Sequence, residues 1–445
     1  MTSAAVYSSL SRVAESLPDP PAPIGIYTCG VTPYDSPHLG HARAAVIFDA
    51  FTRFLRHRGN AVTYLRNITD IDDKIIERSG GEDVKSFAER YIGEYHAMVR
   101  ALGCLPPDGE PRVTDHMPEI IALIGQLVAN GTAYASRGSV YFSVRAFPRY
   151  GSLSGRNVDE LLSGTRLDPG DEKQDPLDFA LWKAEKPGEP SWSSPWGPGR
   201  PGWHIECSAM AMKYLGETID IHGGGQDLIF PHHENELAQS EAATRKTFAR
   251  IWMHNGLITL KSQKMSKSLG NVLSVTDLIR DHGSRVLRFY LLNAHFSSPL
   301  DFSEDRLRET KTALDRFATF PVGSVESTRA GQGPSAITHD FLAALEDNFN
   351  TARAFAVLFD AVAAGNRADA AARAGIAAEI RACGEIIGME LFPPRETDAG
   401  IERLIAERNA ARVARDFRKS DEIRNLLSQK GVIIEDTAQG TRWRR

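Results

Sequence analysis

The segment from residue 24 to residue 65 limits the possible folds most strongly, because it alternates between strand and helix patterns. Residues 24–28 (Ile-Gly-Ile-Tyr-Thr) and 61–65 (Ala-Val-Thr-Tyr-Leu) are short apolar runs typical of buried strands. Between them, apolar side chains recur at helical spacing from Gly40 to Gly59, at Ala44, Ile47, Phe48, Phe51, Phe54 and Leu55. A strand–helix–strand unit predicts an α/β fold with a parallel sheet and a ligand site at the carboxyl ends of its strands.

The rest of the chain predicts further domains. Its 445 residues are too many for one ordinary core, so about two to four domains are expected. Residues 145–201 break the α/β rhythm, with five prolines in 185–201, and predict an insertion within the sheet domain. The later patterns indicate a helix near 203–215, a strand at 218–222, a helix from about 233 to 245, and mostly helices from about 303 onward.

Composition limits the class of protein. The 42% hydrophobic share and the lack of any apolar run near ~20 residues predict a globular protein without a membrane partner. The N-terminus lacks the basic start and apolar stretch of a secretory signal, so we expect a cytoplasmic protein. The four cysteines, Cys29, Cys104, Cys207 and Cys383, are too sparse for a disulfide framework. With a net charge of −5, a nucleic-acid partner would require local basic patches.

A first motif, Pro37-His38-Leu39-Gly40-His41, lies between the first strand and its helix. The N-terminus of a helix presents unpaired N–H groups, which favour phosphate binding. Gly40 lacks a Cβ, so a nucleotide base could lie against the backbone there. The two imidazoles could donate hydrogen bonds to phosphate oxygens. Alone, this pattern fits a helix cap with a surface histidine equally well.

A second motif, Lys264-Met265-Ser266-Lys267-Ser268, places two ammonium groups on a polar loop. Lys264 and Lys267 could neutralise a triphosphate as charge develops in a phosphoryl reaction. The two motifs together resemble the HIGH and KMSKS motifs of class I aminoacyl-tRNA synthetases. This resemblance implies an ATP site formed by His38, Gly40, His41, Lys264 and Lys267, with His38, His41, Lys264 and Lys267 acting in catalysis.

A third group consists of side chains that bind metals. His232 and Glu236 are four residues apart near a helix start and face the same way. Together with Cys29, at the end of the first strand, and Cys207, after the insertion, they could form a tetrahedral zinc site. From the residues alone, a buried structural role for each cysteine stays open, and His233 could be the ligand in place of His232.

Several longer stretches resemble those of cysteinyl-tRNA synthetases. They are Tyr27–Gly30, Asn67–Lys74, Gly202–Ser208, Asp220–Gly225 and Phe230–Glu236, with the tail from Glu435 to Thr437 and from Trp443 to Arg445. The resemblance implies the zinc ligands Cys29, Cys207, His232 and Glu236. It also implies a substrate pocket bordered by Gly30, Thr69, Trp203 and Gly224.

The resemblance implies a complete reaction. The enzyme would activate L-cysteine with ATP and Mg²⁺ to cysteinyl-adenylate and transfer it to tRNA(Cys), with one Zn²⁺ per protomer and a monomeric chain. A size-based pocket separates cysteine from serine by only ~1–3 kcal/mol, whereas a zinc ion distinguishes a thiol from an alcohol chemically. The insertion at 145–201 looks too short and irregular for a folded editing domain.

The resemblance also implies the order of domains. A class I Rossmann-like catalytic domain with an insertion would precede a helical bundle and a small anticodon-binding module, in which Asp436, Trp443 and Arg444 would contact tRNA. We expect an extension at 1–23, catalytic halves at 24–112 and 202–260, a connective insertion at 113–201, the KMSKS loop and stem-contact region at 261–320, the helical bundle at 321–390 and the anticodon module at 391–445.

The sequence is compatible with two alternative functions. A mycothiol-type cysteine ligase would make the same adenylate but pass cysteine to an amino-sugar, and would not need the helical tail. An inactive synthetase-like protein would only bind zinc or RNA, although both signature motifs and all four candidate ligands are intact.

Overall fold

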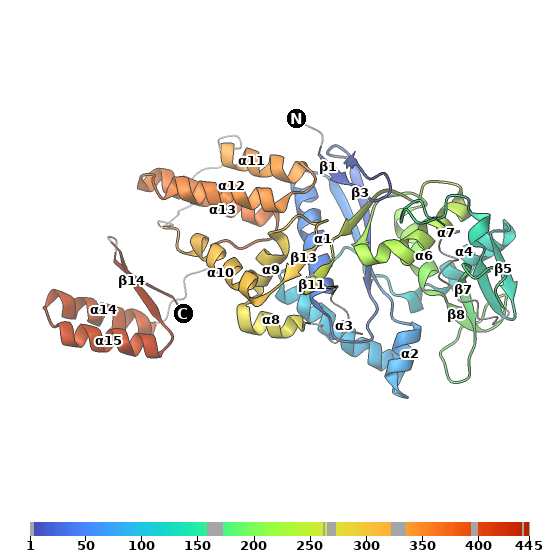
Figure 1. The fold of residues 1–445 in the computed structure, drawn as a ribbon, viewed down its shortest axis with the longest axis horizontal. Coiled ribbons are helices and arrows are strands. Elements are labelled where there is room, and N and C mark those ends of the chain that lie inside the picture. Colours follow the sequence, from blue (N-terminus) through green and yellow to red (C-terminus); the bar gives the residue numbers. More distant parts are fainter. Residues whose placement is uncertain are drawn as a thin grey trace. The chain divides into compact units, whose positions relative to one another are not determined.

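The computed structural model describes residues 4–157, 172–260, 263–264, 273–321, 335–392, 399–437 and 440–444. The chain divides into two compact units, Met1–Leu391 and Phe392–Arg445. In Figure 1 the smaller unit is the red segment. No helix within the described ranges combines the length and the apolar character needed to cross a bilayer.

A four-stranded parallel sheet forms the centre of the larger unit, with strand order β10-β9-β3-β4. Its strand β3 is labelled in Figure 1. Its strands are β3 (Pro23–Val31), β4 (Ala61–Ile68), β9 (Ile219–Gly225) and β10 (Ala249–Asn255). The helices of this domain include α1 (Leu39–His57), α6 (Trp203–Leu215) and α7 (Glu234–Thr244). The predicted parallel sheet is confirmed, as are the helices and strands expected in both halves.

Helix α1 forms for reasons that are visible in the sequence. His38 caps its N-terminus, since the imidazole accepts a hydrogen bond from the Gly40 N–H. Phe48, Phe51 and Phe54 follow at helical spacing and are at most 1% exposed. Burying each ring stabilises the fold by roughly 1.5–3 kcal/mol. This face fixes the helix, and with it the position of its first turn, beside the sheet.

Two helices, α2 (Asp73–Ser79) and α3 (Val84–Ala101), follow β4, and the short helix η1 (Val113–Asp115) leads into α4 (Met117–Ala129). The insertion then forms an antiparallel sheet with strand order β5-β6-β7-β8. These strands are β5 (Ala133–Ser136), β6 (Ser139–Phe142), β7 (Phe179–Ala184) and β8 (Gly199–Pro201), with the short helix η2 (Val144–Ala146) after β6.

The insertion is therefore more regular than its sequence indicates. Most of the prolines in 185–201 fall in the hairpin connection between β7 and β8, where they interrupt no ladder. Pro201 ends β8, a strand at the edge of the sheet, where a missing N–H is tolerated. Short strands joined by a proline-rich turn show no long periodicity, and this explains why the pattern looked irregular.

The expected N-terminal extension contains a hairpin of β1 (Ala5–Tyr7) and β2 (Ala14–Ser16). It is joined to the catalytic sheet, because the Ser9 N–H donates to the Trp252 carbonyl at 2.9 Å and the Trp252 N–H donates to Ser8 Oγ at 3.1 Å. These bonds supply partners for the outer edge of β10.

After β9, the short helices η3 (Gln226–Leu228) and η4 (Ile229–His233) lead into α7. A small sheet with order β12-β11-β13 follows β10 and is built from β11 (Ile258–Leu260), β12 (Gln263–Lys264) and β13 (Leu300–Phe302). Helices α8 (Val275–His282) and α9 (Ser284–Leu292) lie between β12 and β13 in the chain. Beyond β13 come α10 (Glu304–Ala318), α11 (Ala336–Glu346), α12 (Thr351–Gly365) and α13 (Ala370–Ile386), which confirm the predicted helical region.

The smaller unit contains α14 (Ala399–Val413), α15 (Phe417–Gln429) and a hairpin of β14 (Ile433–Thr437) and β15 (Gly440–Arg444). Its core consists of the buried residues Ile401, Ile405, Ile423, Leu427 and Val432. This separate core gives the unit its own source of stability.

Candidate active site

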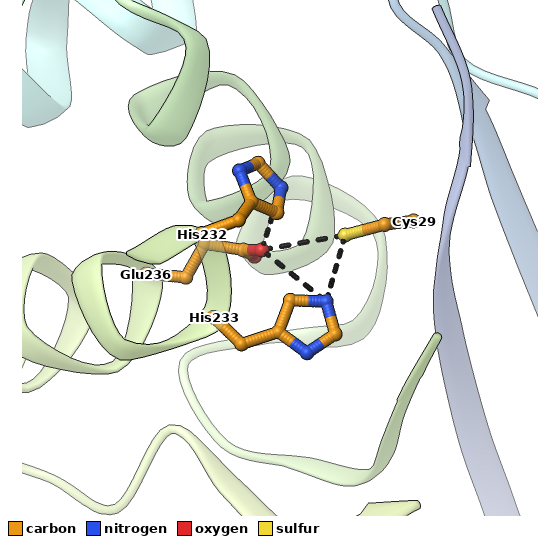
Figure 2. A group of neighbouring side chains, drawn as sticks. All are labelled: Cys29, His232, His233 and Glu236. Atoms are coloured by element: carbon orange, nitrogen blue, oxygen red, sulfur yellow. Dashed lines mark hydrogen bonds and ion pairs between the residues drawn. The ribbon is translucent and has the colours of Figure 1, made fainter. Parts of the chain in front are cut away.

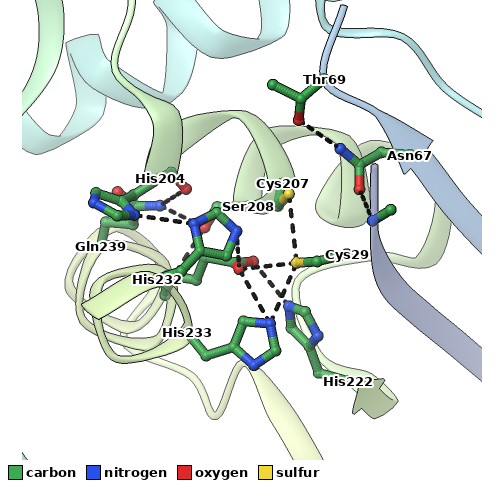
Figure 3. A network of polar contacts seen from close by, with 12 residues as sticks. Cys29, Asn67, Thr69, His204, Cys207, Ser208, His222, His232, His233 and Gln239 are labelled. Carbon is green, nitrogen blue, oxygen red and sulfur yellow. Dashed lines mark hydrogen bonds and ion pairs between the residues drawn. The ribbon is translucent and has the colours of Figure 1, made fainter. Parts of the chain in front are cut away.

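A buried cluster of sulfur, nitrogen and oxygen atoms lies at the carboxyl end of β3. The pairing of β3 with β4 shifts register between Thr28 and Val31, and Cys29 lies in this irregular stretch. Its Sγ is 3.6 Å from Cys207 Sγ on α6 and 3.3 Å from Glu236 Oε1 on α7 (Figures 2 and 3). The ends of a strand and of two helices therefore meet at one point.

Two adjacent histidines complete this cluster. His232 Nε2 lies 3.0 Å from Glu236 Oε1, and His233 Nε2 lies 3.3 Å from Cys29 Sγ (Figure 2). Cys29, His232, His233 and Glu236 each offer one ligand atom, and these atoms lie within 4.8 Å of one another. This group contains three of the four residues predicted as zinc ligands, together with His233, the alternative histidine. The fourth predicted ligand, Cys207, is outside the group and adjoins it through Cys29.

The charges inside the cluster compensate one another. Burial opposes a charged His232, but Glu236 and Cys207 raise the pKa of this histidine to about 10. Burial also opposes a charged Glu236, yet His222 and His232 hold the pKa of its carboxyl well below the usual range. The Cys29 thiol donates to Cys207 Sγ, which lowers the pKa of Cys207 to about 6, while burial raises the pKa of Cys29. Protons therefore bridge the donor atoms.

Three further histidines surround the cluster, and the sequence indicated no role for them. His222 Nε2 lies 2.8 Å from Glu236 Oε2, and His204 Nδ1 lies 3.0 Å from His232 Nδ1 (Figure 3). His254 Nε2 lies 2.7 Å from His233 Nδ1. Such outer contacts orient the inner side chains. His204 and His222 occur inside recognisable motifs, whereas no sequence signal marks His254, which is brought in by β10.

Gly30 and Thr69, which were predicted to border the substrate pocket, are joined by one amide. Asn67 Oδ1 accepts a hydrogen bond from the Gly30 N–H at 2.9 Å, and Asn67 Nδ2 donates to Thr69 Oγ1 at 3.1 Å (Figure 3). A Cβ atom on Gly30 would lie 1.7 Å from the Asn67 carbonyl oxygen. Asn67 therefore fixes both residues, and only glycine fits at position 30.

The other two predicted pocket residues also lie against the cluster. The ring of Trp203 stacks on the ring of His232, with a centroid distance of 4.3 Å and an interplanar angle of 27°. A Cβ atom on Gly224 would lie 3.0 Å from His233 Cε1. All four predicted pocket residues are thus connected with the buried cluster, directly or through Asn67.

The first signature motif, from Pro37 to His41, forms the start of α1. His38 Nδ1 accepts from the Gly40 N–H at 3.1 Å, and His41 Nδ1 accepts from the His38 N–H at 3.2 Å. The two imidazole rings stack at 3.8 Å with an interplanar angle of 13°. This helix N-terminus follows the carboxyl end of β3, the strand that carries Cys29.

The second signature motif, from Lys264 to Ser268, is only partly within the described residues. Lys264 lies in β12, where its backbone pairs with Thr259, and Lys267 lies outside the described residues. Beyond this motif in the sequence, Ser274 forms a β-bridge with His38. Ser274, six positions after Ser268 in the sequence, is therefore beside the first motif.

The three residues predicted to contact tRNA lie in the hairpin of the smaller unit. Asp436 accepts two hydrogen bonds of 2.8 Å from Arg408 and a further one from Arg412. Trp443 Nε1 donates to Glu402 Oε1 at 2.8 Å, and Arg444 is the last residue of β15. Asp436 and Trp443 thus hold the hairpin to α14, a structural role that the sequence did not indicate.

Comparison with known proteins agrees with this arrangement. Residues 18–312 match the family model of the tRNA synthetases class I (C) catalytic domain, and residues 340–392 match the DALR domain. The chain is 48% identical over 475 residues to a cysteine–tRNA ligase of Geobacter sulfurreducens and 48% identical over 457 residues to one of Thioalkalivibrio sulfidiphilus. Each alignment covers 99% of both chains.

A solved structure shows the same fold at low sequence identity. Methionyl-tRNA synthetase of Mycobacterium tuberculosis bound by methionyl-adenylate has a TM-score of 0.60 and 16% identity, covering 82% of this chain and 90% of that one. The catalytic sheet, the match to the class I catalytic model and the full-length relatives agree. The chain belongs to the cysteine–tRNA ligases, a family of class I aminoacyl-tRNA synthetases, and is a ligase that joins cysteine to tRNA.

Proposed function

We propose that Cys29, Cys207, His232 and Glu236 hold one zinc ion per protomer and that this ion reads the thiol of the substrate cysteine. The observation that supports this most directly is the convergence of two sulfurs, an imidazole and a carboxylate in one buried place. Thiolate, imidazole and carboxylate are the ligands that zinc takes in proteins.

The donor set fits a divalent cation. Protons bridge the two sulfurs and the histidine–carboxylate pair. A metal ion would displace these protons and supply the positive charge in their place. His222 and His204 hold Glu236 and His232 in orientation through hydrogen bonds. When bound, zinc would favour a thiolate over an alcohol and so select cysteine against serine.

Pocket residues of this chain would orient the substrate. Trp203 supplies a flat wall against His232, and Asn67 holds Gly30 and Thr69 in place. A rigid wall of this kind would exclude water and would fix the carboxylate of cysteine for attack on the α-phosphate of ATP, with pyrophosphate as the leaving group. No protein nucleophile is required for that step.

The ATP site would lie between the two signature motifs. His38, Gly40 and His41 at the start of α1 would contact the nucleotide and its phosphates, and Lys264 and Lys267 would stabilise the charge of the transition state. Mg²⁺ would arrive bound to the ATP phosphates. The β-bridge between His38 and Ser274, just beyond the second motif, supports this arrangement.

The acceptor would be tRNA(Cys), with Asp436, Trp443 and Arg444 in contact with the anticodon. An indole can stack on an unpaired base, and an arginine can bind phosphate. Asp436 is already paired with Arg408 and Arg412, so it would act through this arginine pair or share it with RNA. The mycothiol-type alternative has no support from the full-length relatives, which are cysteine–tRNA ligases.

Metal analysis of two matched cysteine variants tests the zinc proposal. The wild-type chain should carry about one equivalent of zinc, Cys207→Ala should lose most of it, and the affinity for cysteine should fall with it. Cys383→Ala is the control, because Cys383 is also buried but lies in α13 and contacts Thr338. Loss of zinc in Cys207→Ala with unchanged cysteine affinity would refute the thiol-reading role.

A further inference from the structure

Arg43 is a fully buried arginine two residues after His41 in helix α1. Its side chain is 0% exposed, and its guanidinium donates to five backbone carbonyls. The acceptors and their distances are Gly256 (2.8 Å), Leu257 (3.0 Å), His295 (3.4 Å), Phe296 (3.3 Å) and Ser298 (2.6 Å). Every one of these carbonyls belongs to a segment far from α1 in the sequence.

The burial of this charged group is unfavourable for the stability of the folded protein. Burial lowers the pKa of Arg43 to about 10, and among the residues that the structure describes no carboxylate forms an ion pair with it. A buried charge without a counter-charge is normally avoided, because desolvation is incompletely compensated by neutral carbonyls. Arg288, which is 3% exposed, has the counter-charge that a buried arginine normally has. It pairs with Asp49 and also donates to backbone carbonyls.

The carbonyls that Arg43 binds belong to the two segments that lead into the small sheet. Gly256 and Leu257 lie directly before β11, and residues 295–298 lie directly before β13. Strand β11 pairs with β13 and, through Thr259, with Lys264 in β12. These two segments are in close contact, because a Cβ atom on Gly256 would lie 2.1 Å from the Ser298 carbonyl oxygen. Arg43 thus fastens the sheet that carries Lys264 to the helix that carries His41.

We propose that Arg43 is a positioning residue for adenylation that sets the separation between the two signature motifs. This inference rests on the proposed ATP site. A planar fork with five N–H donors can hold several carbonyls at fixed angles, which a lysine ammonium cannot do. The guanidinium makes no contact with substrate in this role. It acts by holding His38 and His41 on one side, and β11 with Lys264 on the other, in register for the transition state.

The test compares Arg43→Lys with Arg288→Lys in the full-length, zinc-loaded enzyme. Both variants should lower the melting temperature, because each removes a buried guanidinium group and its hydrogen bonds. Arg43→Lys should reduce kcat for cysteine-dependent ATP–pyrophosphate exchange about 100-fold per folded molecule, as expected for a misplacement of about 1 Å. Its KM for cysteine and its zinc content should stay unchanged. Arg288→Lys should retain the wild-type exchange rate per folded molecule.

A second variant disturbs the contact between the segments before β11 and β13 and leaves the charge of Arg43 in place. Gly256→Ala places a Cβ against the Ser298 carbonyl, so it should reproduce the loss of kcat with unchanged cysteine KM. This variant tests the inference if Arg43→Lys does not fold.

The inference is wrong if Arg43→Lys and Gly256→Ala catalyse exchange at the wild-type rate, or if Arg288→Lys loses as much activity as they do. If Lys264→Ala and Lys267→Ala keep full exchange, the proposed ATP site itself fails. If those lysine variants lose exchange while Arg43→Lys and Gly256→Ala keep it, only the inference fails.

Discussion

The Sγ atoms of Cys29 and Cys207 lie 3.6 Å apart, although 178 positions separate the two residues in the sequence. One sulfur is at the end of β3, in the first catalytic half, and the other is in α6, after the whole insertion. The cluster therefore forms only when both halves of the sheet domain have folded around the insertion.

Zinc binding should weaken as the pH falls. The pKa of His232 is raised to about 10, so at neutral pH a cation must displace at least the His232 proton. Because each displaced proton opposes binding, affinity should drop at least about tenfold per pH unit between about pH 8 and about pH 6. Competition with a chelating dye at several pH values measures this slope. An affinity that does not change with pH would contradict the bridging protons.

Lys267 should act on the transition state of adenylation. Lys267→Ala is expected to lower the rate of ATP–pyrophosphate exchange ~10²–10³-fold, because its ammonium group would stabilise charge that develops on the phosphates. Cysteine binding, followed by calorimetry, should stay close to that of the wild type. Lys311→Ala is a matched control, since Lys311 lies exposed on α10. Equal exchange rates in the two variants would show that this loop is not part of the catalytic site.

Gly30→Ala should weaken cysteine activation. Its Cβ would lie 1.7 Å from the Asn67 carbonyl oxygen, so the pocket wall must move and the Asn67 hydrogen bonds to Gly30 and Thr69 must break. We expect KM for cysteine to rise by about tenfold or more. Gly375→Ala is the control: Gly375 lies in α13 with no atom within 4 Å of its added Cβ, so stability should rise slightly. Normal KM for cysteine in Gly30→Ala would show that this wall is not part of the pocket.

Removal of the smaller unit should separate the two steps of the reaction. A chain that ends at Leu391 keeps the sheet domain and the helices up to α13, and ends where the two compact units divide. Pyrophosphate exchange should remain nearly intact, whereas aminoacylation of tRNA should fall severely. A melting curve of the truncated chain shows whether it is folded. Equal aminoacylation by the truncated and the full-length chain would contradict the tRNA role of this unit.

Asp436→Asn should weaken the smaller unit and impair aminoacylation, with exchange unaffected. Arg408 lowers the pKa of Asp436 well below its usual range, so the ion pair stabilises the folded state above the ordinary carboxyl pKa and is lost as the pH falls through the lower, folded-state value. The Asp436 side chain is 42% exposed, which limits this contribution to about 1 kcal/mol or less. The difference between the wild type and Asp436→Asn in urea unfolding at about pH 7 measures it. A variant with unchanged stability at neutral pH would contradict the structural role.

The sequence by itself determined the parts of this protein that depend on local pattern. Apolar periodicity between residues 24 and 65 predicted the strand–helix–strand unit, since amphipathic spacing reflects burial on one face. The two signature motifs and the candidate ligands could be named because their residue types have specific chemistry. The hairpin at β7 and β8 was not predicted, because short strands joined by proline-rich turns carry little periodicity.

Tertiary structure alone decided which distant groups meet. His254 lies on β10 and reaches His233 only because β10 packs at the edge of the sheet, and no spacing rule connects positions 233 and 254. The five carbonyls around Arg43 belong to two segments whose proximity depends on the pairing of β11 with β13. Backbone carbonyls carry no sequence signal, since every residue has one. A buried arginine that binds only carbonyls is therefore visible only after the chain has folded.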